Sequence, residues 1–250
     1  MNKRNILIAA VAIAIVLAGA VWYFLLRSDA PPPATIEGAV AAVTGETTTT
    51  VGGGETATST TAAANTTAAP TATAGIDGAW MADDSVSFVG YRIEEELASL
   101  GAITAVGRTS AIEASLSYSG TSVTDLSVVV DMTTLQSDRS QRDGAMRTRG
   151  LETGSFPSAS FVLTSPIELD VAPTPGATIT ATASGDLTLH GVTQPVTLDI
   201  EGSLVEGTMV VVGSIEIALV DYGIEKPTGF SVLGIADVGL LEIQLAFVRG

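Results

Sequence analysis

The sequence contains no cysteine and only one histidine among its 250 residues. Without cysteine there is no disulfide framework, no thiolate metal site and no lipid-modified lipoprotein terminus. One histidine cannot assemble the usual transition-metal sites, which need several nitrogen or sulfur ligands. A folded domain of this chain must therefore be stabilised by its own apolar core.

Basic residues are also scarce: 11 lysines and arginines stand against 27 acidic residues, for a net charge of −16. Residues 1–27 carry three positive side chains, residues 28–79 carry five acids and no base, and residues 80–250 carry 22 acids against eight bases. A domain this acidic is repelled by phosphate backbones and by anionic lipid surfaces. We expect no nucleic-acid partner.

Catalytic patterns are missing as a group. There is no Gly-x-Ser-x-Gly nucleophile elbow, and the lone His190 lies between Leu189 and Gly191 at an expected hairpin tip. We interpret His190 as an exposed turn residue. The sequence predicts neither an enzyme nor a metal site, and it offers no catalytic residue.

The longest apolar run extends from Ile6 to Leu26 and is flanked by Lys3 and Arg4 on one side and Arg27 on the other. Roughly 20 apolar residues suffice for a helix that crosses the bilayer. Residues 1–27 are therefore predicted to be a transmembrane anchor. The positive-inside bias places the rest of the chain outside the cytoplasm, as a single-pass protein of the cell membrane.

A cleavable signal peptide is the alternative, because Ala18-Gly19-Ala20 resembles a cleavage site. The apolar run continues beyond this site, and Trp22 and Tyr23 suit the interfacial belt of a membrane helix. An uncleaved anchor is the favoured interpretation.

Residues 28–79 are rich in Thr, Ala, Gly and Pro, with few large side chains. Such a composition cannot offset the entropy of ordering the chain. We expect a disordered linker over 28–79, followed by one domain over 80–250.

The period of hydrophobicity becomes two after Ser85, which indicates antiparallel strands with one apolar face. The clearest alternation lies in residues 126–132, 196–201, 215–219 and 241–247. Turn signals follow at Ser119-Gly120, His190-Gly191, Glu206-Gly207 and Pro227-Thr228-Gly229. The polar, arginine-rich stretch from Leu135 to Leu151 predicts one short crossing helix. About eight strands and a helix fit a closed barrel or a sandwich, and periodicity does not choose between them.

Three ordered motifs carry a family resemblance. They are Arg142-Asp143 with Met146-Arg147, Phe156-Pro157, Ala159 and Phe161; the hairpin Gly185–Val196, GDLTLHGVTQPV; and Asp221-Tyr222-Gly223-Ile224. Together they resemble the YceI family. The resemblance spans most of residues 80–250 and excludes the anchor and the linker.

The resemblance implies an all-β fold, an extended lipocalin-like antiparallel barrel of about eight strands with a short helix near its opening. It also implies an exported protein that binds a long polyisoprenoid chain inside the barrel. Eight strands enclose room for side chains or for one slender ligand. The lumen candidates are the inward apolar positions Tyr91, Leu126, Val128, Val130, Phe161, Leu163, Leu187, Leu189, Val196, Leu198, Ile215, Ile217, Leu241 and Ile243.

Half of the domain's basic residues are Arg139, Arg142, Arg147 and Arg149. Arg142 and Arg147 are candidates for gripping an anionic head group at the mouth of the barrel. The competing and favoured interpretation is structural, with Asp138 and Asp143 as local partners.

The end of the first strand departs from the family pattern. Where many members have a His-Leu pair, this chain reads Ile93-Glu94-Glu95-Glu96-Leu97. The triplet predicts a negatively charged mouth that disfavours a pyrophosphate head group.

The leading functional hypothesis is a membrane-tethered, extracytoplasmic protein that holds a long apolar lipid for storage, transport or protection. A bound isoprenoid lipid or quinone is the only small molecule that this hypothesis includes, and no cofactor is expected. The alternative is a structural or interaction module of the cell envelope whose barrel is filled by its own side chains. An enzyme acting on a quinone or isoprenoid ranks last, because acid, nucleophile and metal ligands are all missing.

Overall fold

A computed structural model describes residues 30–45, 75–227 and 231–250. The predicted anchor over residues 1–27, most of the predicted linker and the tip of the turn signal at Pro227-Thr228-Gly229 lie outside these ranges. Within the three ranges, no helix is long and apolar enough to cross a membrane.

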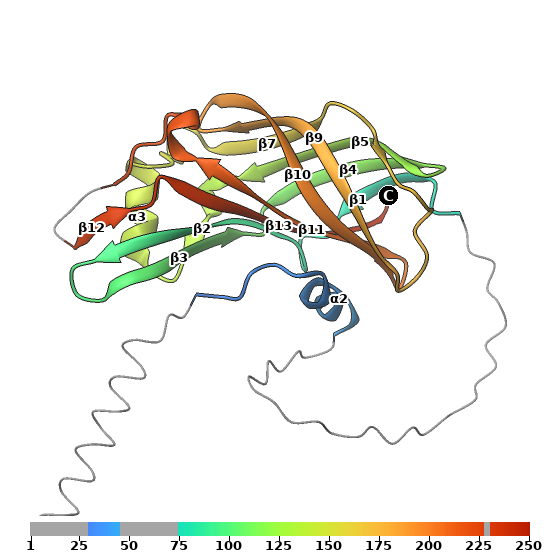
Figure 1. The fold of residues 1–250 in the computed structure, drawn as a ribbon, viewed down its shortest axis with the longest axis horizontal. Coiled ribbons are helices and arrows are strands. Elements are labelled where there is room, and N and C mark those ends of the chain that lie inside the picture. The colour runs from blue at the N-terminus through green and yellow to red at the C-terminus, as the bar shows by residue number, and fades with distance from the viewer. Residues whose placement is uncertain (1–29, 46–74, 228–230) are drawn as a thin grey trace, which may run out of the picture.

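The domain is an all-β barrel with antiparallel strand pairing (Figure 1). Its sheet closes into a ring of eight strands because β1 pairs with both β4 and β13. In spatial order the ring consists of β1 (Gly78–Ala82), β4 (Ile112–Ser119), β5 (Ser122–Asp131), β7 (Ser158–Leu163), β9 (Thr178–Leu189), β10 (Val192–Val205), β11 (Thr208–Ala218) and β13 (Val238–Arg249). The closed ring confirms a barrel and excludes the sandwich.

One end of the barrel is extended by a second strand pair. β2 (Phe88–Leu97) pairs with the first half of β13, and β3 (Gly101–Thr109) pairs with β2. Shorter elements complete this end: η1 (Met132–Thr134), β6 (Gln136–Ser137), α3 (Ser140–Thr148), η2 (Leu219–Tyr222) and β12 (Val232–Ile235). The remaining short strand, β8 (Ile167–Glu168), pairs with the start of β5. We call the extended end, which carries α3, the α3 end.

The sequence pattern accounts for most of these elements. All four alternating segments lie mainly in ring strands, and the polar stretch forms α3 inside the expected range of Leu135 to Leu151. His190-Gly191 and Glu206-Gly207 both adopt positive φ at the tips of two-residue hairpins. Type I′ turns require this backbone, which matches the twist of the strands they join.

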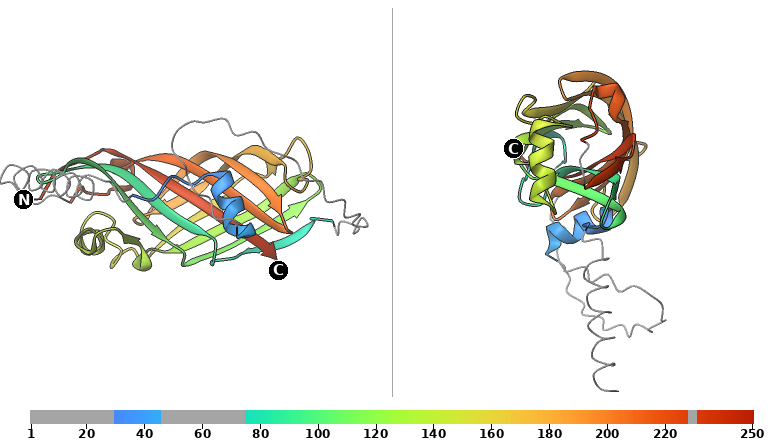
Figure 2. Two further views of the ribbon diagram at one scale, coloured as in Figure 1. Left: turned by 90° about the horizontal axis from the view of Figure 1, so that it is seen from below. Right: turned by 90° about the vertical axis from the view of Figure 1, so that its left-hand side faces the viewer.

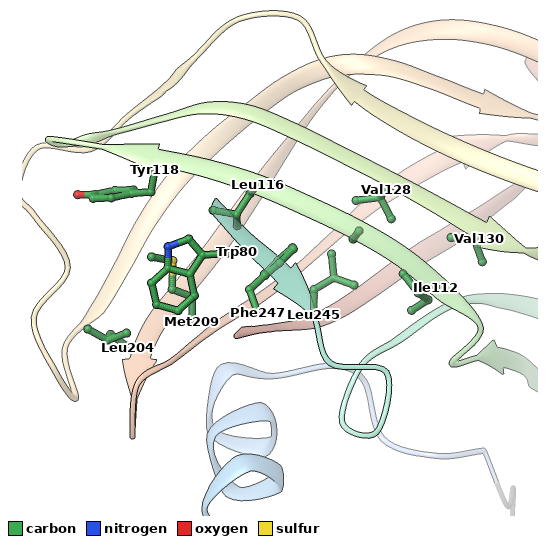
Figure 3. Close-up of a cluster of buried hydrophobic side chains, with 11 residues drawn as sticks. Trp80, Ile112, Leu116, Tyr118, Val128, Val130, Leu204, Met209, Leu245 and Phe247 are labelled. Atoms are coloured by element: carbon green, nitrogen blue, oxygen red, sulfur yellow. The ribbon is translucent and has the colours of Figure 1, made fainter. Parts of the chain in front are cut away.

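The opposite end of the barrel is filled by large side chains, and we call it the Trp80 end (Figure 3). Trp80, Tyr118 and Phe247 are among the most buried side chains of the described residues and pack with Leu204 and Met209. Trp80 Nε1 donates to the Ile76 carbonyl at 3.0 Å, and the Tyr118 hydroxyl donates to the Gly120 carbonyl at 2.7 Å. The polar atoms of both rings are thus satisfied.

The prediction of a linker without structure over residues 28–79 is wrong for residues 36–44. These residues form the helix α2 (Ile36–Thr44), which lies on the outer wall of the barrel (Figure 2). Thr35 caps its N-terminus by accepting from the Gly38 amide at 3.1 Å, and Gly45 ends it in the left-handed conformation. The low-complexity composition hides an apolar stripe of helical period, Ile36, Ala39, Val40 and Val43.

This helix explains why β11 is apolar on both faces. Val211 and Ile215 face the lumen, whereas Val210 and Val212 face outward and pack against Ile36 and Ala39. An outward apolar pair on an antiparallel strand needs a cover. Residues 30–45 supply it.

Candidate functional site

The lumen of the barrel contains three neighbouring apolar cavities. The middle cavity has a volume of about 110 Å³, the cavity at the α3 end about 110 Å³, and the one at the Trp80 end about 80 Å³. The middle cavity shares Val89 and Leu241 with the first neighbour, and Leu116 and Val211 with the second. The three cavities therefore follow one another along the barrel.

The structure places all the predicted lumen candidates except Leu163 on the walls of these cavities. Tyr91, Leu189 and Ile217 line the cavity at the α3 end, Leu241 lines both, and the others line the middle cavity. Leu163 packs instead in a cluster with Ile167, Ala183 and Leu198. That these side chains contact a ligand stays a prediction.

Sequence reasoning missed the parts of the lining that come from outside the regular strands. At the α3 end these residues are Met132, Leu135, Met146, Leu151, Leu219 and Ile224, from η1, α3, η2 and the segments beside them. Alternation reaches Met132 and Leu219, which end the alternating segments 126–132 and 215–219. It cannot assign Leu135, Met146, Leu151 and Ile224, because their backbone does not follow a period of two. Val123, Ile167 and Ile200 of the middle cavity do lie in strands. Ile200 continues the alternation of Val196 and Leu198 and was within reach of the same signal.

Tyr91 forms the boundary between the lumen and the polar groups beneath α3. Its ring covers Gly107, its partner across β2 and β3, where a Cβ atom would lie 2.4 Å from the ring. Burial raises the pKa of the Tyr91 phenol well above its usual range, although the positive charge of Arg142 acts in the opposite direction. Tyr91 therefore stays neutral at physiological pH.

Arg142 is a buried structural cation. Its Nη2 donates to Glu95 Oε2 at 2.7 Å, and its Nη1 donates to Asp138. Burial opposes its charge, but the hydrogen bond and charge of Glu95, with the charge of Asp138, outweigh burial and raise the pKa of Arg142. Two carboxylates already occupy the guanidinium, so the contacts support the structural interpretation over a free head-group site.

The other predicted mouth residue, Arg147, lies exposed in the last turn of α3. The structure does not bring it together with Arg142. Asp143, the second local acid expected beside the arginines, accepts from the amide and hydroxyl of Ser137 at 2.9 and 2.7 Å. This bond orients the start of α3.

The acidic triplet contributes less negative charge to the mouth than its sequence suggests. Glu95 is buried and paired with Arg142, whereas Glu94 and Glu96 are exposed. Alternation along β2 explains the split, since neighbouring residues of a strand point to opposite faces. The Glu94 carboxylate accepts from the Thr104 hydroxyl at 2.6 Å.

The interpretation of His190 as an exposed turn residue is wrong. Its side chain is only 8% exposed, and its ring packs against Phe156 with 4.2 Å between the ring centroids. Nδ1 lies 3.0 Å from the Tyr222 carbonyl, and Nε2 lies 3.0 Å from Glu152 Oε2. His190 thus joins the hairpin between β9 and β10 to two segments of the α3 end. The sequence correctly predicts that His190 lies in a turn, but segments distant in sequence bury its side chain.

The chemistry available in the lumen is that of apolar contact. The middle cavity is lined by aliphatic side chains together with Phe161, Phe247 and Ser160. Among the described residues, no group of three His, Asp or Glu side chains is placed to hold a metal ion. The arrangement can remove a hydrocarbon chain from water, and it offers few groups that would orient a polar ligand.

Two sequence relatives are bacterial UPF0312 proteins. The one from Vibrio parahaemolyticus is 31% identical over 134 residues, which are 50% of this chain and 65% of that protein. The one from Shewanella denitrificans is 34% identical over 149 residues, which are 55% of this chain and 73% of that protein.

Two solved structures share the fold at 16% identity. A polyisoprenoid binding domain from Saccharophagus degradans, implicated in plant cell wall breakdown, matches with a TM-score of 0.56 and covers 69% of this chain and 99% of its own. BcnA from Burkholderia cenocepacia matches with a TM-score of 0.53 and covers 66% and 98%. The family match itself runs from residue 80 to residue 247, the whole of the barrel apart from its edges. The chain therefore belongs to the family of YceI-like domains.

Proposed function

We propose that this protein is a binding protein that holds a long, slender apolar lipid in the lumen of its barrel. The observation that carries the proposal is the row of three apolar cavities along the barrel. The polyisoprenoid binding of the Saccharophagus degradans domain suggests the ligand class, a polyisoprenoid or a quinone with such a tail. Residues 1–27 would anchor the protein in the cell membrane, with the barrel outside the cytoplasm.

Burial of the ligand supplies enough free energy for such binding. Each isoprenoid unit has five carbons, and burial contributes about 0.8 kcal/mol per carbon, or roughly 4 kcal/mol per unit before the cost of ordering the chain. Each larger cavity, at about 110 Å³, is smaller than a cavity of about 150 Å³ that admits benzene. A lipid with several acyl chains or a bulky ring is therefore disfavoured, and a single chain of small cross-section, such as an isoprenoid tail, fits better.

The small volumes also favour one alternative, a barrel filled by its own side chains and without ligand. Typical ligand pockets have volumes of roughly 300–1,000 Å³. The decisive experiment is to purify the full chain, extract it with organic solvent and identify the released lipids by mass spectrometry. Uptake of a fluorescent geranylgeranyl probe by delipidated protein is measured in parallel.

Two adjacent valines of β5 give a matched pair of variants. Val128 is buried and lines the middle cavity, whereas Val129 faces outward and is 42% exposed. We expect Val128→Trp to abolish probe uptake by filling the cavity, and Val129→Trp to leave uptake unchanged. Circular dichroism must show that both variants remain folded. Absence of any extracted lipid and of probe uptake in the unsubstituted protein would favour the filled barrel.

Recovery of chemically unchanged probe after long incubation separates a carrier from an enzyme. Conversion of the probe would contradict the binding proposal. The same extraction identifies the head group of the natural ligand, which the apolar lumen does not select.

A further inference from the structure

Residues 30–45 are attached to the outer wall of the barrel at two places. The Pro31 carbonyl accepts from Arg92 at 2.8 Å, and the Pro32 carbonyl accepts from Arg108 at 2.6 Å. Further along, α2 buries Ile36 and Ala39 against β11. We call residues 30–45 the strap.

The strap has a definite direction. Its helix covers Val210 and Val212, which pair with Ala246 and Gln244 in the second half of β13. Its Pro31 carbonyl contacts Arg92, which pairs with Leu240 near the start of β13. Going towards the N-terminus, the strap therefore runs from the Trp80 end towards the α3 end, as Figure 1 shows.

The short connection to the predicted anchor limits how far the barrel lies from the membrane. Five residue steps separate Leu26, the last apolar residue of the predicted span, from Pro31. A fully extended chain covers at most about 3.6 Å per step, so this connection spans no more than roughly 18 Å. The five residue steps from Arg92 to Leu97 of β2 reach roughly 17 Å towards the α3 end at about 3.3 Å each. With the strap in place, the α3 end cannot lie far from the bilayer.

The two surfaces near this connection differ in character. The α3 end exposes Val220, Leu233 and Val238. The wall beside α2 instead forms a groove of about 750 Å³ whose lining includes Glu37, Asp199 and Glu201. Apolar residues favour contact with a bilayer interface, and carboxylates oppose it.

The rim of the α3 end also carries Glu94, Glu96 and Asp237, all exposed. Asp237 is paired with Lys226, whereas the two glutamates would be repelled by anionic lipid. The surface that fits this rim is that of an electrically neutral bilayer.

We propose that the strap fixes the barrel with its α3 end against the surface of the membrane that holds the anchor. The cavity at the α3 end then faces the lipid directly, and an apolar chain can pass between bilayer and lumen without crossing water. This inference rests on the anchor in the proposed function. A long flexible linker would let the barrel move freely relative to the membrane, whereas the strap holds the barrel in one orientation.

The test uses the full chain in phosphatidylcholine vesicles and exploits the absence of cysteine. Single cysteines at Leu233, in β12 of the α3 end, and at Val171, in the loop at the Trp80 end, carry the same fluorophore. The two side chains are 63% and 62% exposed, so they form a matched pair. A quencher attached to the lipid head groups reports their distance from the bilayer.

We expect quenching at Leu233→Cys to be at least about twofold stronger than at Val171→Cys, because β13, at 12 residues and about 3.4 Å each, separates the two ends by tens of ångströms. The double variant Ile36→Asp/Ala39→Asp places two carboxylates in the contact with β11 and should release the strap. The difference between the two labels should then disappear. Ala42→Asp changes an exposed position of the same helix and should preserve the difference.

Equal quenching at the two sites overturns the proposal, as does a difference that survives release of the strap. Failure of the full chain to float with the vesicles removes the anchor and the inference together. Probe uptake in the lumen is scored separately. Uptake with equal quenching refutes only the orientation, whereas unequal quenching without uptake refutes only the proposed ligand binding.

Discussion

Glu242 is a buried carboxylate in the outer wall of the barrel, beneath the strap. Its side chain is 1% exposed, and its carboxylate accepts from Arg92 Nε at 3.0 Å and from Arg108 Nη2 at 3.2 Å. The same two arginines hold the carbonyls of Pro31 and Pro32. Arg108 also lies over the Phe88 ring, 4.0 Å from its centroid. Glu242 is thus the anion that balances two cations under the strap.

We predict that Glu242→Ala destabilises the domain by about 3 kcal/mol. Removal of one partner of a buried ion pair typically costs 3–5 kcal/mol because a charge is left without compensation. The lower end applies here, since both arginines keep part of their surface in water. For a domain of this size, 1 kcal/mol changes Tm by roughly 2–4 °C, so a decrease of roughly 6–12 °C is expected.

Urea denaturation followed by circular dichroism measures the decrease in the free energy of unfolding. Hydrogen exchange of the α2 amides reports whether the strap is loosened. Glu216→Gln is the matched control, because Glu216 is an exposed glutamate on the neighbouring strand β11. Its change in unfolding free energy should stay within about 0.5 kcal/mol. A loss below about 1 kcal/mol for Glu242→Ala, with unchanged exchange in α2, would refute the reasoning.

Three further predictions follow from the α3 end and the lumen. The free energy of unfolding should fall as the pH rises above about 10, because burial raises the Tyr91 pKa and the unfolded chain therefore loses the phenol proton first. In Tyr91→Phe, the midpoint of urea denaturation should decrease less steeply with pH between about pH 9 and 11. His190→Asn tolerates the positive φ but loses the Glu152 contact, and should lower stability by about 1–2 kcal/mol in thermal unfolding. An added Cβ at Gly185 would lie 2.4 Å from the Phe161 ring and 2.5 Å from the Val162 carbonyl, so Gly185→Val should reduce both probe uptake and stability. Gly234→Val, where a Cβ meets open space, should change neither.

The strands and the lumen were predictable because their signal is local. Alternation fixes which residues of β10 and β13 point inward once a barrel is assumed, and the family resemblance supplied the barrel. Leu163 lines none of the three cavities, because inward orientation does not ensure a place on the cavity wall; it packs instead against Ala183 and Leu198. Cavity shape depends on packing between strands, and a single strand does not encode it.

The polar contacts were less predictable because their partners are far apart in sequence. Asp138 lies four residues before Arg142 and was within reach of local reasoning, but Glu95 lies 47 residues away. His190 likewise finds Glu152 38 residues upstream. Burial of a turn residue depends on which segments cover it, so the hairpin motif predicted the turn and not its environment.

Two features of the sequence indicate the strap, and each supports the other. Residues 209–212 of β11, Met-Val-Val-Val, are apolar on both faces, which an antiparallel strand with one wet face does not require. Residues 36–43 contain the only helical apolar stripe in a stretch otherwise rich in Thr, Ala and Gly. Each is weak alone, since short apolar runs are common. Together they match an apolar outer wall that needs a cover with an apolar helix that needs a partner. The helix brings residues 30–45 onto the barrel, so only a few residues lie between the barrel wall and the predicted anchor.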